Sequence, residues 1–143
     1  MAGYFSKLNG NVYEGSYVAS ADLKNGVFVV LGTDNKVAAS SADTNVELRM
    51  KEATNIGALS AVRFEVVKAD TEVYMTENLF VRDENAAYDD TDYTIKAGEQ
   101  VRMKRLVPGD ELVISVTSAI ASAFAAGDVY NVAASGLIAK KAG

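Results

Sequence analysis

The sequence predicts a mainly β fold: a single compact β-barrel or β-sandwich domain with one short helix and an extended N-terminal arm. Three observations predict it. Apolar and polar residues alternate with a period of two in several segments, glycine-containing turns separate those segments, and 143 residues suit one domain that buries its own core. We expect residues 1–20 to form the arm or an edge segment and residues 21–143 to form the β-rich domain.

The N-terminal segment carries aromatic and aliphatic side chains without a sustained period. This pattern favours an irregular edge segment that lies on its own domain, and it also fits an extended arm whose aromatic side chains anchor on another subunit. Both interpretations place the apolar side chains against protein. The candidate interaction residues in this segment are Tyr4, Phe5, Leu8, Val12 and Tyr13.

The next segments read as strands. Residues 27–31 form a continuous apolar run, typical of a strand covered on both faces, and residues 36–39 are its expected hairpin partner. Residues 46–51 alternate strictly, with charged side chains on the outer face, and residues 63–68 repeat this pattern. Two shorter strands are expected at residues 71–75 and 79–82.

The one marked charge run spans residues 83–92 and holds five carboxylates. Such a cluster supplies the oxygen ligands that calcium takes, but the run lacks the glycine and the terminal glutamate of an EF-hand loop, which favours a solvated loop. A carboxylate pair for glycoside hydrolysis is formally available here as well. A carbohydrate-binding or carbohydrate-active domain using this loop with Tyr88 or Tyr93 is therefore one alternative.

The segment that follows is a basic hairpin. Its alternation breaks at Arg105-Leu106, which predicts a bulge or tight bend before Pro108. We expect Lys96, Arg102, Lys104 and Arg105 on its outer face. That face either provides solubility and pairs with the acidic loop, or it forms a basic binding surface for an acidic partner. The candidate interaction residues here are Arg102, Lys104 and Arg105.

Residues 118–126 are alanine-rich, with Ile120 and Phe124 four residues apart, which predicts a short helix that ends at Gly127. We expect this helix to plug one end of a barrel. Two closing strands are expected at residues 128–133 and 136–140.

Three turns share one pattern. Ala97-Gly98-Glu99, Pro108-Gly109-Asp110 and Ala126-Gly127-Asp128 each place a small residue, a glycine and an acid directly before an apolar segment. Glycine allows a positive φ, and the acid can bond backbone amides at the turn. The repetition predicts that successive strands enter a sheet from similar corners.

The amino-acid composition narrows the classes of function that we expect. Cysteine and histidine are absent, which removes disulfides, thiolate metal sites and the side chain most used for proton transfer near neutral pH. A net charge of −5 and a pI near 4.7 argue against a nucleic-acid partner. The chain contains no apolar run of membrane-spanning length and no signal-peptide core. We expect a non-enzymatic protein made in the cytoplasm, with no cofactor, no catalytic or metal-binding residues and no membrane partner.

Three stretches resemble the small β-rich decoration, or cement, proteins of tailed-bacteriophage capsids. They are residues 22–40, with the Asn-Gly-Val strand opening, residues 96–115, with the Pro-Gly-Asp corner, and residues 125–140, with a closing Gly-Asp, strand, Gly, strand order. The resemblance implies a compact β domain, often trimeric, that sits on the outer capsid surface and bridges subunits of the major capsid protein. It also implies that an N-terminal arm helps in attachment. A tail or baseplate component is a further alternative.

Overall fold

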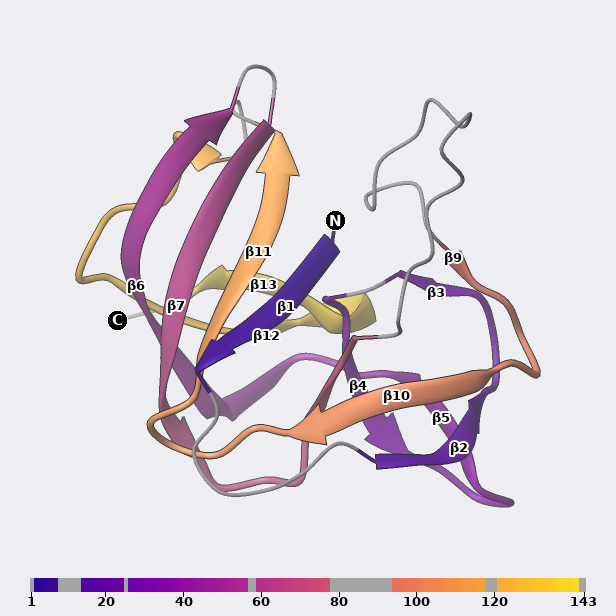
Figure 1. Ribbon diagram of the computed structural model, residues 1–143. Helices are drawn as coiled ribbons and strands as arrows, with labels where there is room; N and C mark the ends of the chain where they lie inside the picture. Colours follow the sequence, from indigo (N-terminus) through magenta and orange to yellow (C-terminus); the bar gives the residue numbers. More distant parts are fainter. Residues whose placement is uncertain are drawn as a thin grey trace, which may run out of the picture.

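A computed structural model describes residues 2–7, 14–24, 26–56, 59–77, 94–117 and 121–141. The chain is mainly β, with almost no helix, and contains a six-stranded sheet and a closed five-stranded barrel (Figure 1). The predicted class, a compact β domain, is confirmed.

The six-stranded sheet is antiparallel throughout. Its strands, in spatial order, are β1 (Ala2–Lys7), β11 (Glu111–Thr117), β7 (Leu59–Ala69), β6 (Asp43–Ile56), β12 (Val129–Ala133) and β13 (Leu137–Lys140). The long hairpin of β6 and β7 forms its centre, and Figure 1 shows these two strands rising beside β11 as a curved layer.

The barrel has one parallel contact, between β2 and β5, and its other contacts are antiparallel. Its strands, in order around the barrel, are β10 (Gln100–Arg105), β2 (Glu14–Ala19), β5 (Lys36–Ala39), β4 (Phe28–Leu31) and β8 (Tyr74–Thr76). A separate two-stranded pair joins β3 (Leu23–Lys24) to β9 (Thr94–Ile95), and η2 (Ala134–Gly136) is a 3-10 turn before β13.

The sheet packs one face onto the main core. β6 alternates as the sequence predicts, with Val46, Leu48 and Met50 buried and Glu47 and Arg49 directed outward. Across from them lie Phe64 and Val66 of β7, with Leu112 and Ile114 of β11 in the same cluster. Full burial of one such side chain contributes about 1.5–3 kcal/mol.

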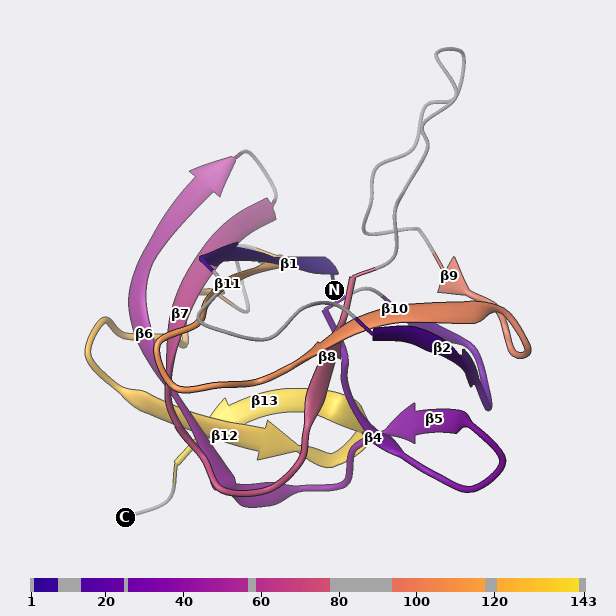
Figure 2. The ribbon, with the colours of Figure 1, turned by 60° about the horizontal axis from the view of Figure 1, so that its bottom comes forward.

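Strands β4 and β8 form a wall between this core and the core of the barrel. Phe28 and Met75 face the sheet cluster, whereas their neighbours Val29 and Tyr74 face the barrel cluster. Figure 2 shows β8, a strand of the barrel, on the side of the barrel that faces the sheet. This arrangement confirms that the apolar run at residues 27–31 is covered on both faces, because each face meets a different core.

Other expectations had different outcomes. The described parts of residues 1–20 are strands: β1 is an edge strand of the sheet, and β2 lies in the barrel, where Ala19 is 2% exposed. Backbone hydrogen bonds explain why this segment forms strands, since pairing with β11 and β10 does not require apolar alternation.

The strand expected at residues 79–82 lies outside the described residues. So do residues 118–120 of the expected helix; among its described residues, Ala121 is helical and residues 122–123 and 126 are turns.

Candidate protein-interaction surface

The three predicted corners share one backbone construction. In each, the glycine has a positive φ, and the N–H of the acidic residue donates to the carbonyl oxygen three residues earlier. These are the features of a type II turn, in which the third position requires glycine. The φ values are 87° at Gly98, 98° at Gly109 and 89° at Gly127, and the three hydrogen bonds measure 2.9, 3.0 and 3.1 Å.

Each turn continues directly into a β-bulge. The glycine N–H donates to the carbonyl of one residue on a neighbouring strand, and that residue's N–H donates back to the carbonyl of the acid. The glycine and the acidic residue together therefore pair with a single residue of the neighbouring strand. This two-to-one pairing, with the glycine in the left-handed region, is a G1 bulge. The opposed residues are Ala19 for Gly98-Glu99, Val66 for Gly109-Asp110 and Met50 for Gly127-Asp128.

The strand opening at Gly26 repeats the bulge. Gly26 has a φ of 85°, its N–H donates to the carbonyl of Thr76 at 2.9 Å, and the N–H of Thr76 donates to the carbonyl of Val27 at 3.1 Å. Each of the three stretches that carry the resemblance therefore contains this glycine bulge. The repeated geometry fixes the angle at which β4, β10, β11 and β12 begin.

At the Pro-Gly-Asp corner, the structure corrects one predicted interaction residue. Lys104 and Asp110 are both fully buried, and the Lys104 Nζ lies 2.5 Å from the Asp110 Oδ2. The same carboxylate oxygen accepts the N–H of Val107 at 3.1 Å, and Lys104 also donates to the carbonyl of Arg105 at 3.1 Å. The expectation that Lys104 lies on an outer basic face is wrong, because its ammonium group neutralises a buried turn carboxylate.

The other two basic candidates on β10 remain near the surface. Arg102 and Arg105 are half-buried, and the Arg102 Nη1 donates to the carbonyl of Glu77 at 3.3 Å. The break in alternation that the sequence shows at Arg105-Leu106 is real, since Leu106 turns into the main core and its N–H bonds the carbonyl of Val73 at 2.9 Å. Arg102 and Arg105 stand three residues apart on β10, so that alternation directs their side chains to opposite faces of the strand, and the single basic face that the sequence suggested is not formed.

The N-terminal candidates are only partly placed. Tyr4 and Phe5 belong to β1, where they stand opposite Val113 and Leu112 in the register with β11. Leu8, Val12 and Tyr13 lie outside the described residues, as do the acidic run at residues 83–92 and both tyrosines of the carbohydrate alternative. The role of these residues in binding stays a prediction.

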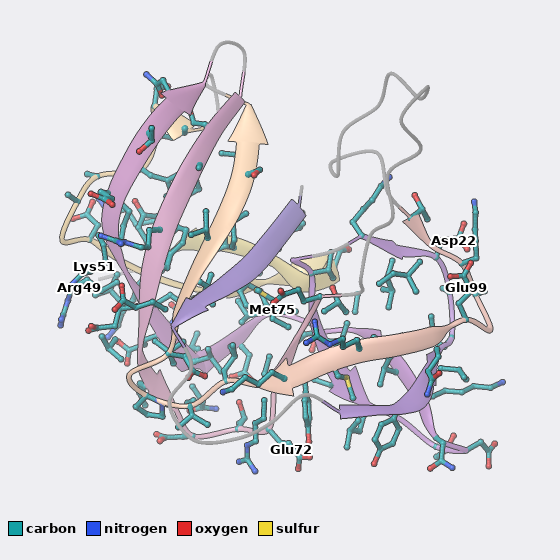
Figure 3. The ribbon with its side chains drawn as sticks, viewed as in Figure 1. Asp22, Arg49, Lys51, Glu72, Met75 and Glu99 are labelled. Carbon is teal, nitrogen blue, oxygen red and sulfur yellow. The ribbon has the colours of Figure 1, made fainter. Side chains whose placement is uncertain are left out.

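The outer face of the six-stranded sheet carries charges of both signs, which the sequence alternation indicates but whose pairing it does not give. Glu47 accepts from Lys141 at 2.7 Å and pairs with Lys68 at 3.7 Å. Arg63 bridges Glu52 at 2.8 Å and Glu111 at 3.7 Å. Figure 3 shows Arg49 and Lys51 projecting outward from β6. On the described part of this face, charges of both signs therefore pair with one another.

Two carboxyl groups on the described surface titrate below their ordinary range. The hydrogen bond and the positive charge of Lys141, helped by Lys68, lower the pKa of Glu47 despite partial desolvation. The backbone N–H of Ala97, helped by Lys96, lowers the pKa of Asp22. Figure 3 shows Asp22 beside Glu99 at the first corner. Both carboxylates accept a hydrogen bond from a group distant in the sequence, Asp22 from the N–H of Ala97 and Glu47 from Lys141.

Within the described ranges, no three acidic, histidine or cysteine side chains gather in a way that would hold a metal ion. Among the same residues, no helix is long and apolar enough to cross a membrane. In comparisons with protein-family models, with curated proteins and with solved structures, nothing matched this chain significantly.

Proposed function

We propose that the chain is a virion structural protein: a capsid decoration protein that binds the outer surface of a phage capsid as a homo-oligomer, with a trimer favoured. It stabilises the lattice by bridging subunits of the major capsid protein. The observation that carries the proposal is the repeated corner, because all three stretches that resemble decoration proteins contain the same glycine bulge.

The physical properties of the fold support a passive structural role. Hydrogen-bonded corners fix the starts of four strands, and the wall of β4 and β8 joins the barrel to the sheet. A body of this kind resists deformation because bending it requires breaking several ladders together. A symmetric oligomer meets a symmetric lattice at several equivalent points, so that weak individual contacts add to strong attachment.

The contact surface proposed here combines the N-terminal segment with Arg102 and Arg105. Deleting residues 1–13 would also remove β1 and uncover the edge of β11, so the sharper test changes charge alone. We expect Arg102→Glu/Arg105→Glu to reduce binding to empty, expanded capsids of the encoding phage by at least tenfold, measured by cosedimentation.

The matched control is Arg49→Glu/Lys51→Glu, which makes the same change in charge on the outer face of the sheet. We expect this control to bind as the unmodified protein does. Equal loss in both variants would show that net charge, and not this surface, governs attachment. Unchanged binding in the Arg102/Arg105 variant would remove these arginines from the proposed surface.

A further inference from the structure

β13 lies at the edge of the six-stranded sheet opposite β1, and it pairs with β12 alone. Among the described elements, β12 is the only one with which β13 makes an extensive contact. Ile138 packs against the main core, whereas Leu137 is 45% exposed. Ala139 and Lys140 are exposed as well. A strand with one neighbour and few buried contacts opens at a lower free energy than the centre of a sheet.

The start of β13 is held by packing. Gly136 of η2 is buried, and its N–H donates to the carbonyl oxygen of Ser40 at 2.8 Å. The turn η2 contacts the barrel strands β4 and β5. Figure 2 shows β13 running from this point beside β12. This end of the strand is therefore fixed to the barrel.

The other end of β13 is held by charge. The Lys140 Nζ lies 3.1 Å from the Asp128 Oδ2, and the Lys141 Nζ donates to the Glu47 Oε1 at 2.7 Å. Beside these ion pairs, the Lys141 N–H donates to the carbonyl oxygen of Val129 at 2.9 Å. The two lysine side chains are 65% and 50% exposed. Ion pairs with such exposure weaken when salt is added.

Glu47 is the more enclosed of the two carboxylates, with a side chain that is 15% exposed. Lys68 of β7 lies 3.7 Å from it and also pairs with Asp70, and Asn131 of β12 stands opposite Glu47 in the register. The hydrogen bond from Lys141, followed by the charges of Lys141 and Lys68, lowers the pKa of Glu47. The contact with Lys141 is therefore present above the ordinary value of 4.5 and is lost as the pH falls through the folded value.

From these observations, we propose that β13 is a detachable edge strand controlled by charge. It stays anchored at Gly136 and opens at its Lys140–Lys141 end, separately from the rest of the sheet, when the two ion pairs are broken by salt or acid. Tyr130 and Val132 remain in the main core during this opening, because they belong to β12, which also pairs with β6. The opening leaves β12 as the edge of the sheet, and it does not rest on the proposed function.

Hydrogen exchange followed by NMR tests the opening in the full chain, because it resolves single amides. The amide of Lys141 is compared with that of Val66, whose N–H donates to the carbonyl of Asp110 in the interior of the sheet. At neutral pH, we expect Lys141 to be less protected than Val66. Its protection relative to Val66 should fall about threefold or more when the ionic strength rises from about 0.01 M to about 1 M. The same ratio should fall below about pH 4.5.

The variant Glu47→Gln/Asp128→Asn should show the low protection of Lys141 at every salt concentration. Its matched control is Glu52→Gln/Glu65→Gln, which removes two carboxylates whose partners are Arg63, Arg49 and Lys51 instead of the lysines of β13. The control should keep both the protection of Lys141 and its dependence on salt. Equal protection of Lys141 and Val66 would overturn the separate opening. Equal effects of the two double variants, or no effect of either, would overturn its control by the two ion pairs.

Discussion

At the scale of single residues, the Lys104–Asp110 pair sets the geometry where the barrel strand β10 passes into the sheet strand β11. Both groups are fully buried, and each satisfies the other. Removing one partner from such a pair strands a charge in the interior, which costs far more than the net contribution of the pair itself.

We therefore expect Lys104→Met to lower the free energy of unfolding by about 3–5 kcal/mol. The double variant Lys104→Met/Asp110→Asn should recover much of this loss, because the amide oxygen still accepts the Val107 N–H and no charge remains buried. Urea unfolding of the two single variants and the double variant measures the coupling. Additive losses would contradict a direct interaction between the two side chains.

Alanine substitutions at Gly98 and Gly136 distinguish the cost of a positive φ from the cost of a steric clash. A Cβ at Gly98 meets no heavy atom within 4 Å, whereas a Cβ at Gly136 would lie 2.3 Å from the carbonyl oxygen of Phe28 and 2.5 Å from the Cγ1 of Val27. Gly98→Ala should cost about 1–2 kcal/mol, the strain of a positive φ alone. Gly136→Ala should cost clearly more, since β4 must move. Equal thermal shifts in the two variants would argue against the close approach of η2 to β4.

The Glu47 carboxylate gives a pH dependence whose sign follows from its contacts. Because the pKa of Glu47 is lowered in the folded state, its contribution to stability is present above the ordinary value of 4.5 and is lost as the pH falls through the folded value. The stability difference between the unmodified protein and Glu47→Gln should be largest near neutral pH and should shrink below about pH 4.5. Denaturant titrations at several pH values measure it, and a difference that grows toward low pH would reverse the sign.

At the scale of elements, strands β4 and β8 decide whether the barrel and the sheet behave as one unit. Each strand sends adjacent side chains into different cores, as Phe28 and Val29 do. Neither core can come apart without exposing one face of this wall. The two parts should therefore unfold together.

Tryptophan probes test this cooperativity, because the chain has no tryptophan. Tyr17 packs against the barrel cluster, and Phe124 packs against the sheet cluster in edge-to-face contact with Phe64 and Tyr130. For each of the variants Tyr17→Trp and Phe124→Trp, unfolding is followed by tryptophan fluorescence, which reports on one core, and by circular dichroism, which reports on the whole fold. We expect the two methods to give the same unfolding midpoint in each variant. A separate fluorescence midpoint in either variant would mean that the wall does not couple the cores.

The strands and turns also show which structural features can be predicted from sequence patterns. Alternation predicts the burial of β6 and β7 correctly, and the small-glycine-acid pattern predicts the three corners, because both depend on local rules of side-chain direction and backbone freedom. The sequence does not predict that Lys104 is buried. Its side chain follows the outward alternation of Arg102, but the chain bends toward the core at Leu106, and only the tertiary position of Asp110 makes burial tolerable.

At the scale of the whole molecule, long-range pairing is what the sequence leaves undetermined. The aperiodic N-terminal residues give no indication that β1 joins the sheet at β11 while β2 joins the barrel beside β10. Their partners lie about a hundred residues away in the chain, and backbone ladders between them leave little trace in side-chain pattern. The fold class is thus predictable from local signals, and the topology is not.

The described part of the molecule combines a body with two cores and, on the outer face of the six-stranded sheet, ion pairs such as Arg63–Glu52 and Lys68–Glu47. Within the described ranges, no group of side chains converges as a metal site, and the buried ion pair serves the corner at Pro108. The structural role stays a proposal, which places the attachment on the N-terminal segment and the two arginines of β10.

The most direct test of the proposed function is the binding of the purified protein to empty, expanded phage capsids, measured by cosedimentation together with capsid melting. A decoration protein should bind saturably at a fixed number of copies per capsid and should raise the capsid melting temperature. Folded protein that fails to cosediment at saturating concentration, and that leaves the melting temperature unchanged, would contradict the proposed function.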